Sequence, residues 1–142
     1  MREKIKIAIV DDHQIVIDGL KLLLGTENNF DIVLESTDSL LLLENLENKS
    51  IDILLTDIMM PTMSGYELSL MVKKKYPAIK IIALSMNGEG ALIHKMIEEA
   101  DITFSPDFLD PEYCVALSNN SSKSCCASNG LFVNLLTNFS IY

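Results

Sequence analysis

Three short apolar runs constrain the fold of this chain more than any other feature of its sequence. They read IKIAIV at residues 5–10, IDILLT at 51–56 and IKIIAL at 79–84. Runs of this kind are typical of strands that are covered on both faces of a parallel sheet. A weaker strand is expected at 31–36 and a fifth at 102–104. The chain is therefore expected to build a five-stranded sheet.

Between these strands the apolar residues recur with the helical period, which predicts four helices. The first covers about 13–24 and stops at Gly25. The second follows Leu40, Leu43 and Leu46, the third begins at a capping box of Ser64 and Glu67 and ends at Tyr76-Pro77, and the fourth covers about 90–99. Strand and helix alternate, which predicts a doubly wound α/β fold with right-handed crossovers.

The pattern weakens after Asp101. Eight of the thirteen residues in 118–130 are Ser or Asn, and no apolar period runs through them. Such a segment is typical of a loop or of disorder. We expect one domain at 1–117, atypical after about residue 101, and a polar tail at 118–142.

Composition excludes several classes of function. The 142 residues carry a net charge of −9, whereas a nucleic-acid footprint needs clustered Lys and Arg. We therefore expect no direct nucleic-acid binding by this chain. No apolar run is long enough to span a bilayer and no signal peptide is recognisable, so a cytoplasmic location is expected. The three cysteines are interpreted as free thiols.

Three acids stand where buried strands end. Asp11 and Asp12 follow the first run, and Asp57 follows the run at 51–56. In a flavodoxin-like strand order the first and third strands are neighbours, which brings these carboxylates into one crevice. Mg²⁺ prefers such hard oxygen ligands. A single acid there would more often cap a helix or a turn, but three in this arrangement favour a metal site.

Asp57 is the expected nucleophile, because a carboxylate needs no base to deprotonate it. The crowding of like charges should raise the pKa of at least one carboxylate, so that metal and proton compete. Ser85 ends a strand at the same edge and could donate to a phosphoryl oxygen, although a lone Ser is often a turn residue. A backbone carbonyl near Met59 could add a ligand, although Met-rich loops are more often apolar packing.

His13 follows the acid pair directly. A metal or catalytic role is one interpretation, and the start of the first helix is the other. The helix start is favoured, because Mg²⁺ prefers oxygen ligands. His94 is interpreted as a surface or boundary residue of the fourth helix.

Taken together, the segments IAIVDDHQIVIDGLKLLL, ILLTDIMMPTMSGYEL and IIALSM resemble the response-regulator receiver domain of two-component signalling. The resemblance covers residues 5 to about 100, and the acids, the DxMMPxMSG loop and the hydroxyl residue occur in family order and spacing. The opening VDDH and the helix after it are most similar to receivers that precede a LuxR-type DNA-binding domain. The resemblance implies a CheY-like sheet with strand order 2-1-3-4-5.

The resemblance also implies the chemistry of the site. Asp57 would accept a phosphoryl group from the phosphohistidine of a sensor histidine kinase, with Mg²⁺ held by Asp11, Asp12, Asp57 and the Met59 carbonyl. Ser85 would bind the phosphoryl group, and Phe104 would be the aromatic residue that switches rotamer. The output would be a conformational change upstream of transcription, passed to a DNA-binding domain absent from this chain.

One family residue is missing. Receivers carry a Lys about 22 residues beyond the hydroxyl position, and the count from Ser85 reaches Asp107. The segment after Asp101 is then diverged, rearranged or exchanged between subunits, or translated out of frame. Comparison with the other two reading frames tests the last explanation.

The missing Lys favours a rival hypothesis, in which the chain is a degenerate receiver that serves for docking or homodimerisation. A third hypothesis is a Mg²⁺-dependent phosphohydrolase. It is ranked last, because Met59 stands where that class has a second acid.

Overall fold

The computed structural model describes residues 3–86, 103–106 and 113–117. The helix predicted at 90–99, Asp107 and the tail at 118–142 lie outside the described residues, and the proposed domain boundary stays a prediction. In chain order the described elements are β1 (Ile5–Val10), α1 (Gln14–Leu24), β2 (Phe30–Ser36), α2 (Ser39–Leu46), β3 (Ile53–Asp57), α3 (Gly65–Lys75), β4 (Lys80–Met86), β5 (Thr103–Pro106) and β6 (Tyr113–Leu117).

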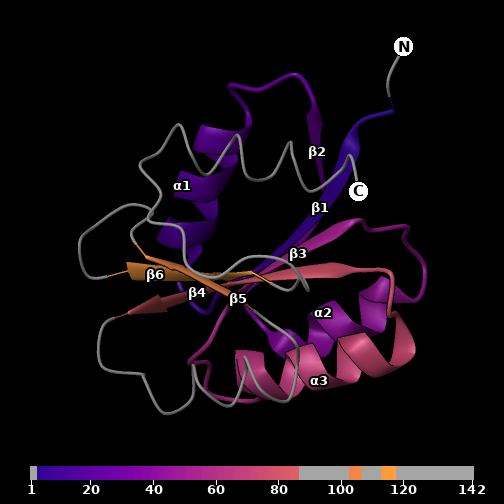
Figure 1. Cartoon of the computed structure of the whole chain (residues 1–142), viewed down its shortest axis with the longest axis vertical. Helices are drawn as coiled ribbons and strands as arrows, with labels where there is room; N and C mark the ends of the chain where they lie inside the picture. Colours follow the sequence, from indigo (N-terminus) through magenta and orange to yellow (C-terminus); the bar gives the residue numbers. More distant parts are fainter. Residues whose placement is uncertain (1–2, 87–102, 107–112, 118–142) are drawn as a thin grey trace.

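The first four strands form a parallel sheet in the order β2-β1-β3-β4, as predicted (Figure 1). Val10 at the end of β1 pairs in register with Thr56 of β3, and Asp57 pairs with Leu84 of β4. The carboxyl ends of these strands therefore share one edge of the sheet. This arrangement confirms the doubly wound α/β class.

Beyond β4 the sheet departs from the expected order. The strand beside β4 is β6, which runs antiparallel to it, and β5 lies outside β6. A fifth strand parallel to β4 at that position was therefore a wrong prediction. Only six residues, 107–112, join β5 to β6, and antiparallel pairing suits so short a connection, whereas a parallel crossover needs a dozen or more residues. The run YCVAL at 113–117 supplies the strand that the sequence pattern did not identify.

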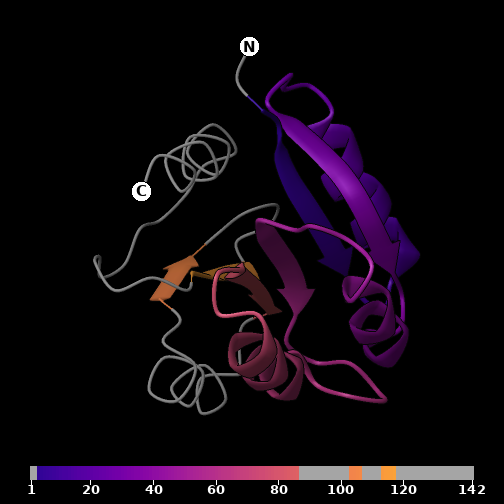
Figure 2. The same cartoon turned by 90° about the vertical axis from the view of Figure 1, so that its right-hand side faces the viewer.

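Helices cover both faces of the sheet (Figures 1 and 2). On one face α1 packs through Ile17, Leu20 and Leu24 against residues such as Ile7 and Ile9 of β1. On the other face α2 and α3 pack against the residues of the strands that alternate with these, including Ala8, Val10 and Leu54. Burial of both faces explains why the strands are almost wholly apolar.

The described helices end where local signals predict. Ser64 caps α3 by accepting from the Glu67 backbone N–H at 3.2 Å, and the Glu67 side chain accepts from the Ser64 N–H at 3.0 Å. The helix stops at Lys75, just before Tyr76-Pro77, as predicted. None of the helices in the described ranges has the length and apolar character needed to cross a membrane.

The capping box of α3 gives a first testable prediction. The variant Ser64→Ala should lower the free energy of unfolding by about 1 kcal/mol, because the first-turn N–H groups lose their acceptor. Denaturant unfolding measures the change, and Ser50→Ala, an exposed serine before β3, is the control with little expected effect. Equal losses in the two variants would contradict the role of the cap.

Candidate metal and phosphoacceptor site

The structure brings the three predicted acids together. Asp11 and Asp12 follow β1 directly, and Asp57 is the last residue of the neighbouring parallel strand β3. One ligand atom each from Asp11, Asp12, Asp57 and His13 can be chosen so that all four lie within 4.8 Å of one another. The convergence expected from the strand order is thus present. The cluster also includes His13, which was not expected among the metal ligands because Mg²⁺ prefers oxygen.

Asp11 is the most deeply buried acid of this cluster, with 3% of its surface exposed. Its Oδ1 accepts a hydrogen bond of 2.8 Å from the His13 backbone N–H. Burial raises the pKa of the Asp11 carboxyl, and the negative charge of Asp12 adds to the rise, while the contacts with His13 oppose it. The predicted rise in a carboxylate pKa is confirmed, but burial is its largest cause and repulsion between the acids is secondary.

The Oδ1 atom of Asp12 is buried, and His13 Nδ1 lies 3.0 Å from it. This oxygen accepts no hydrogen bond from any residue that the structure describes. Native proteins rarely leave a buried polar atom in that state unless an ion, a water molecule or a function accounts for it. Together with the carboxylates of Asp11 and Asp57, this oxygen forms a donor set that fits a hard divalent cation such as Mg²⁺.

His13 begins α1, as the sequence favoured, and its ring also lies beside the two acids. It is the N-cap residue of α1, and its carbonyl accepts from the Val16 N–H at 3.1 Å. Its imidazole Nδ1 also lies 3.0 Å from Asp12 Oδ1 and 3.4 Å from Asp11 Oδ1. The negative charges of Asp12 and then Asp11 raise the pKa of this imidazole. In the sequence, only the position of His13 directly after two acids indicated that its ring could lie beside them.

The loop after β3 holds Asp57 through its backbone. The Gly65 N–H donates to the Ile58 carbonyl at 2.7 Å, so the loop folds back on the end of the strand. A Cβ on Gly65 would lie 1.9 Å from the carbonyl oxygen of Asp57. Only glycine permits this approach without displacing the backbone of Asp57. Gly65 belongs to the DxMMPxMSG motif, but the motif alone did not indicate this contact with Asp57.

Ser85, Met59 and Phe104 are the remaining predicted site residues, and for them the structure gives only a position in a strand or a loop. Ser85 follows Leu84, the register partner of Asp57, so its backbone lies at the same sheet edge. Met59 is an exposed residue of the loop after β3. Phe104 lies in β5 and pairs in register with Ala116 of β6, so β6 separates its strand from β4.

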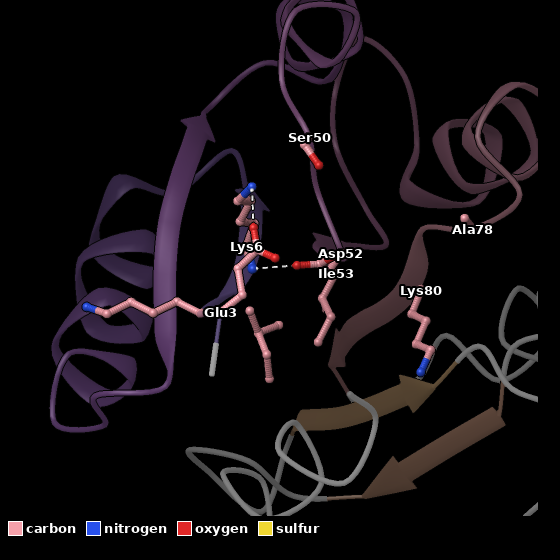
Figure 3. Close-up of a pocket in the computed structure, with 9 residues that line it drawn as sticks. Glu3, Lys6, Ser50, Asp52, Ile53, Ala78 and Lys80 are labelled. Carbon is pink, nitrogen blue, oxygen red and sulfur yellow. Dashed lines mark hydrogen bonds and ion pairs between the residues drawn. The ribbon is translucent and has the colours of Figure 1, made fainter. Parts of the chain in front are cut away.

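A pocket of about 370 Å³ opens at the other end of the strands, away from these acids (Figure 3). Its polar groups engage one another: Lys6 donates its backbone N–H to Asp52 Oδ2 at 2.8 Å, and Lys6 Nζ pairs with Glu3 at 3.5 Å. Lys80 extends away from Lys6 and Glu3 (Figure 3). Burial lowers the pKa of its ammonium, and the charge of Asp52 opposes that shift.

An open α/β sheet with an acidic cluster at the carboxyl ends of the neighbouring strands β1 and β3 is typical of proteins that bind ligands at a topological switch point. Comparison with known families makes the assignment specific. The family model described as the response regulator receiver domain matches residues 7–104, and the chain belongs to that family.

Several relatives in this family are named as regulators. The transcriptional regulatory protein DegU of Brevibacillus brevis is 32% identical over 95 residues, which cover 67% of this chain and 40% of DegU. The receiver domain of RcsB from Salmonella enterica, solved with a phosphomimetic, is 30% identical with a TM-score of 0.64, and the match covers 68% of this chain and 72% of that one. A structure of two RcsB dimers bound to two parallel DNAs has 30% identity and a TM-score of 0.63, with 68% and 49% covered. The chain thus spans less than half the length of the full-length regulator DegU.

Proposed function

We propose that this chain is a phosphoacceptor receiver, in which Asp57 takes a phosphoryl group from the phosphohistidine of a sensor histidine kinase. The observation that carries the proposal is the convergence of Asp11, Asp12 and Asp57 at the switch point of the sheet. Membership of the receiver family supports it. In this proposal the chain signals by contact and turns over no substrate, and a cytoplasmic location would follow from that role.

The chemistry follows from the side chains. A carboxylate oxygen of Asp57 forms a bond to phosphorus as the bond from phosphorus to the donor imidazole nitrogen breaks, and that nitrogen keeps the electron pair. Mg²⁺, when bound, would offset the charge that the phosphoryl oxygens bring to the acids. Asp11, Asp12, Asp57 and the Met59 carbonyl would hold it. Ser85, whose backbone lies at the same edge of the sheet, would bind the phosphoryl group through its hydroxyl.

The readout is also a proposal. Phosphorylation would draw the Ser85 segment toward Asp57 and change a surface that includes Phe104, which biases a two-state element toward its active form. A DNA-binding output domain would receive this change, as the names of the relatives as transcriptional regulators suggest. That domain would lie outside the segment that this chain shares with them.

A phosphodonor experiment tests the proposal. Incubation of the chain with acetyl phosphate and Mg²⁺ should add one phosphoryl mass to the intact protein, and chelation of divalent ions with EDTA should prevent the addition. The measurement is intact-mass spectrometry over a time course. If the mass stays unchanged at every Mg²⁺ concentration, the chain is not a phosphoacceptor for such donors.

A second candidate function is a degenerate receiver that docks or dimerises without phospho-switching. The position of β6 between β4 and β5 favours it, because the strand that carries Phe104 is then not the neighbour of β4. Beryllofluoride with Mg²⁺, a phosphoryl mimic, should in that case leave the oligomeric state unchanged in sedimentation analysis. A shift toward dimers with the mimic would instead support switching.

The buried carboxyl of Asp11 predicts a pH dependence of the metal effect. Its pKa is raised in the folded protein, so without metal the folding free energy becomes less favourable as pH rises through the window between the unfolded and folded pKa values. Mg²⁺ needs the carboxylate form and should offset this loss. The rise in Tm caused by Mg²⁺ should therefore be larger at pH 7 than at pH 4.5. An equal rise at both pH values would contradict competition between proton and metal.

A further inference from the structure

We propose that the His13 imidazole is a fourth side-chain ligand of this site, so that the site selects a nitrogen-accepting first-row cation such as Mn²⁺ over Mg²⁺. This inference rests on the metal site of the proposed function and deepens it. It concerns which ion the site prefers and which residue decides the preference.

The distances suit a shared ion. Two donors that bind one cation at about 2.1 Å in adjacent octahedral positions lie about 3.0 Å apart. His13 Nδ1 lies 3.0 Å from Asp12 Oδ1 and 3.4 Å from Asp11 Oδ1. Opposite positions would be about 4.2 Å apart, so a spread of 4.8 Å among the four ligand atoms needs only a small closure.

In the absence of metal, Asp12 Oδ1 and His13 Nδ1 form an ion pair that lacks the geometry of a hydrogen bond. Asp12 Oδ1 accepts none from the described residues, although His13 Nδ1 is within ion-pair range. A cation placed between the two atoms would satisfy both of them. The cation would then replace the imidazole proton as the positive partner of this oxygen, and the neutral imidazole would become a ligand.

The position of His13 is held while its ring stays accessible. The backbone N–H donates to Asp11 Oδ1 at 2.8 Å, and the carbonyl accepts from the first-turn N–H groups of Val16 and Ile17. The side chain is 67% exposed, so an ion can reach Nδ1 from solvent.

The chemistry of the donors sets the selectivity. Mg²⁺ gains little from an imidazole, whereas first-row transition cations accept imidazole and carboxylate ligands together. A neutral imidazole also completes the ligand set without adding a fourth negative charge. Loss of the imidazole should therefore weaken transition-metal binding and leave Mg²⁺ binding almost unchanged.

The test uses the full chain, made metal-free, and its variants His13→Gln and His94→Gln. His94 is the only other histidine of the chain and serves as the matched control. Mn²⁺ is the probe, because it favours oxygen and nitrogen ligands over the thiols of the three cysteines. Calorimetric titration gives the affinity for Mn²⁺ and Mg²⁺, and electron spin echo of bound Mn²⁺ detects a directly coordinated nitrogen.

We expect His13→Gln to weaken Mn²⁺ binding by on the order of tenfold, to change Mg²⁺ binding less than twofold, and to remove the nitrogen signal. His94→Gln should match the original chain. Absence of the nitrogen signal from the original chain would overturn the proposal. So would tighter binding of both ions by His13→Gln, which would show that the imidazole is a counter-ion displaced by metal.

The outcome separates the two proposals. Mn²⁺ bound with its nitrogen signal, but no phosphoryl addition to Asp57, would support the role of His13 and contradict the phosphoacceptor function. If Asp57 is phosphorylated but both histidine variants lose the same Mn²⁺ affinity, the phosphoacceptor function is supported and the role of His13 is contradicted. If no divalent ion binds, both proposals fail.

Discussion

Asp57→Asn should reduce phosphoryl incorporation from acetyl phosphate to background. The amide that replaces the carboxylate is a poor nucleophile at neutral pH, and no other acid of the cluster stands at the end of β3. The geometry of the site should otherwise persist, since Asn has nearly the volume of Asp. Intact-mass spectrometry with Mg²⁺ measures the loss.

Asp52→Asn is the matched control for this variant. Asp52 precedes the same strand at its opposite end, where its side chain accepts from the Lys6 N–H. Asp52→Asn changes the net charge by the same amount as Asp57→Asn, and it should leave phosphorylation intact. If the phosphoryl mass is still added to Asp57→Asn, or is lost from both variants, Asp57 is not shown to be the acceptor.

Gly65→Ala should be the most destabilising single methyl addition at the site. The new Cβ would lie 1.9 Å from the Asp57 carbonyl oxygen, 2.9 Å from the Asp57 carbonyl carbon and 3.0 Å from Ile58 Cα. All three are backbone atoms, so relief requires moving either the end of β3 or the start of α3. We expect a loss of about 3 kcal/mol or more in the free energy of unfolding. Denaturant unfolding followed by circular dichroism measures it.

Gly19→Ala is the control that the chain itself offers. Gly19 lies within α1, and nothing is within 4 Å of the position that its Cβ would take. Alanine there should stabilise the protein by about 0.5–1 kcal/mol through helix propensity. If Gly65→Ala were as well tolerated as Gly19→Ala, the close approach to Asp57 would not exist in solution.

The rise in Tm caused by Mg²⁺ also distinguishes the two glycine variants. Gly65→Ala displaces the backbone of Asp57, so Mg²⁺ should raise its Tm less than that of the original chain. Gly19→Ala is remote from the acids along α1 and should keep the full response. The two glycine variants therefore separate damage to the site from a change in overall stability.

Sequence reasoning predicted the central sheet and its acids because both depend on local patterns. The runs that became β1, β3 and β4 are apolar on both faces, and the acids directly follow the runs of β1 and β3. The capping box at Ser64 is equally local, since both of its partners lie within one helical turn. Strand order between β1 and β3 then followed from the alternation of strands and helices.

The sequence by itself determined where the central strands end and which carboxylates stand there. Only the tertiary structure decided that β6 takes the place beside β4, that the His13 ring joins the acids, and that Gly65 meets the Asp57 carbonyl. Each of these depends on groups brought together by packing. The free edge of a strand pairs with whichever segment the connections allow to reach it, and the periodicity of a single segment carries no record of that competition.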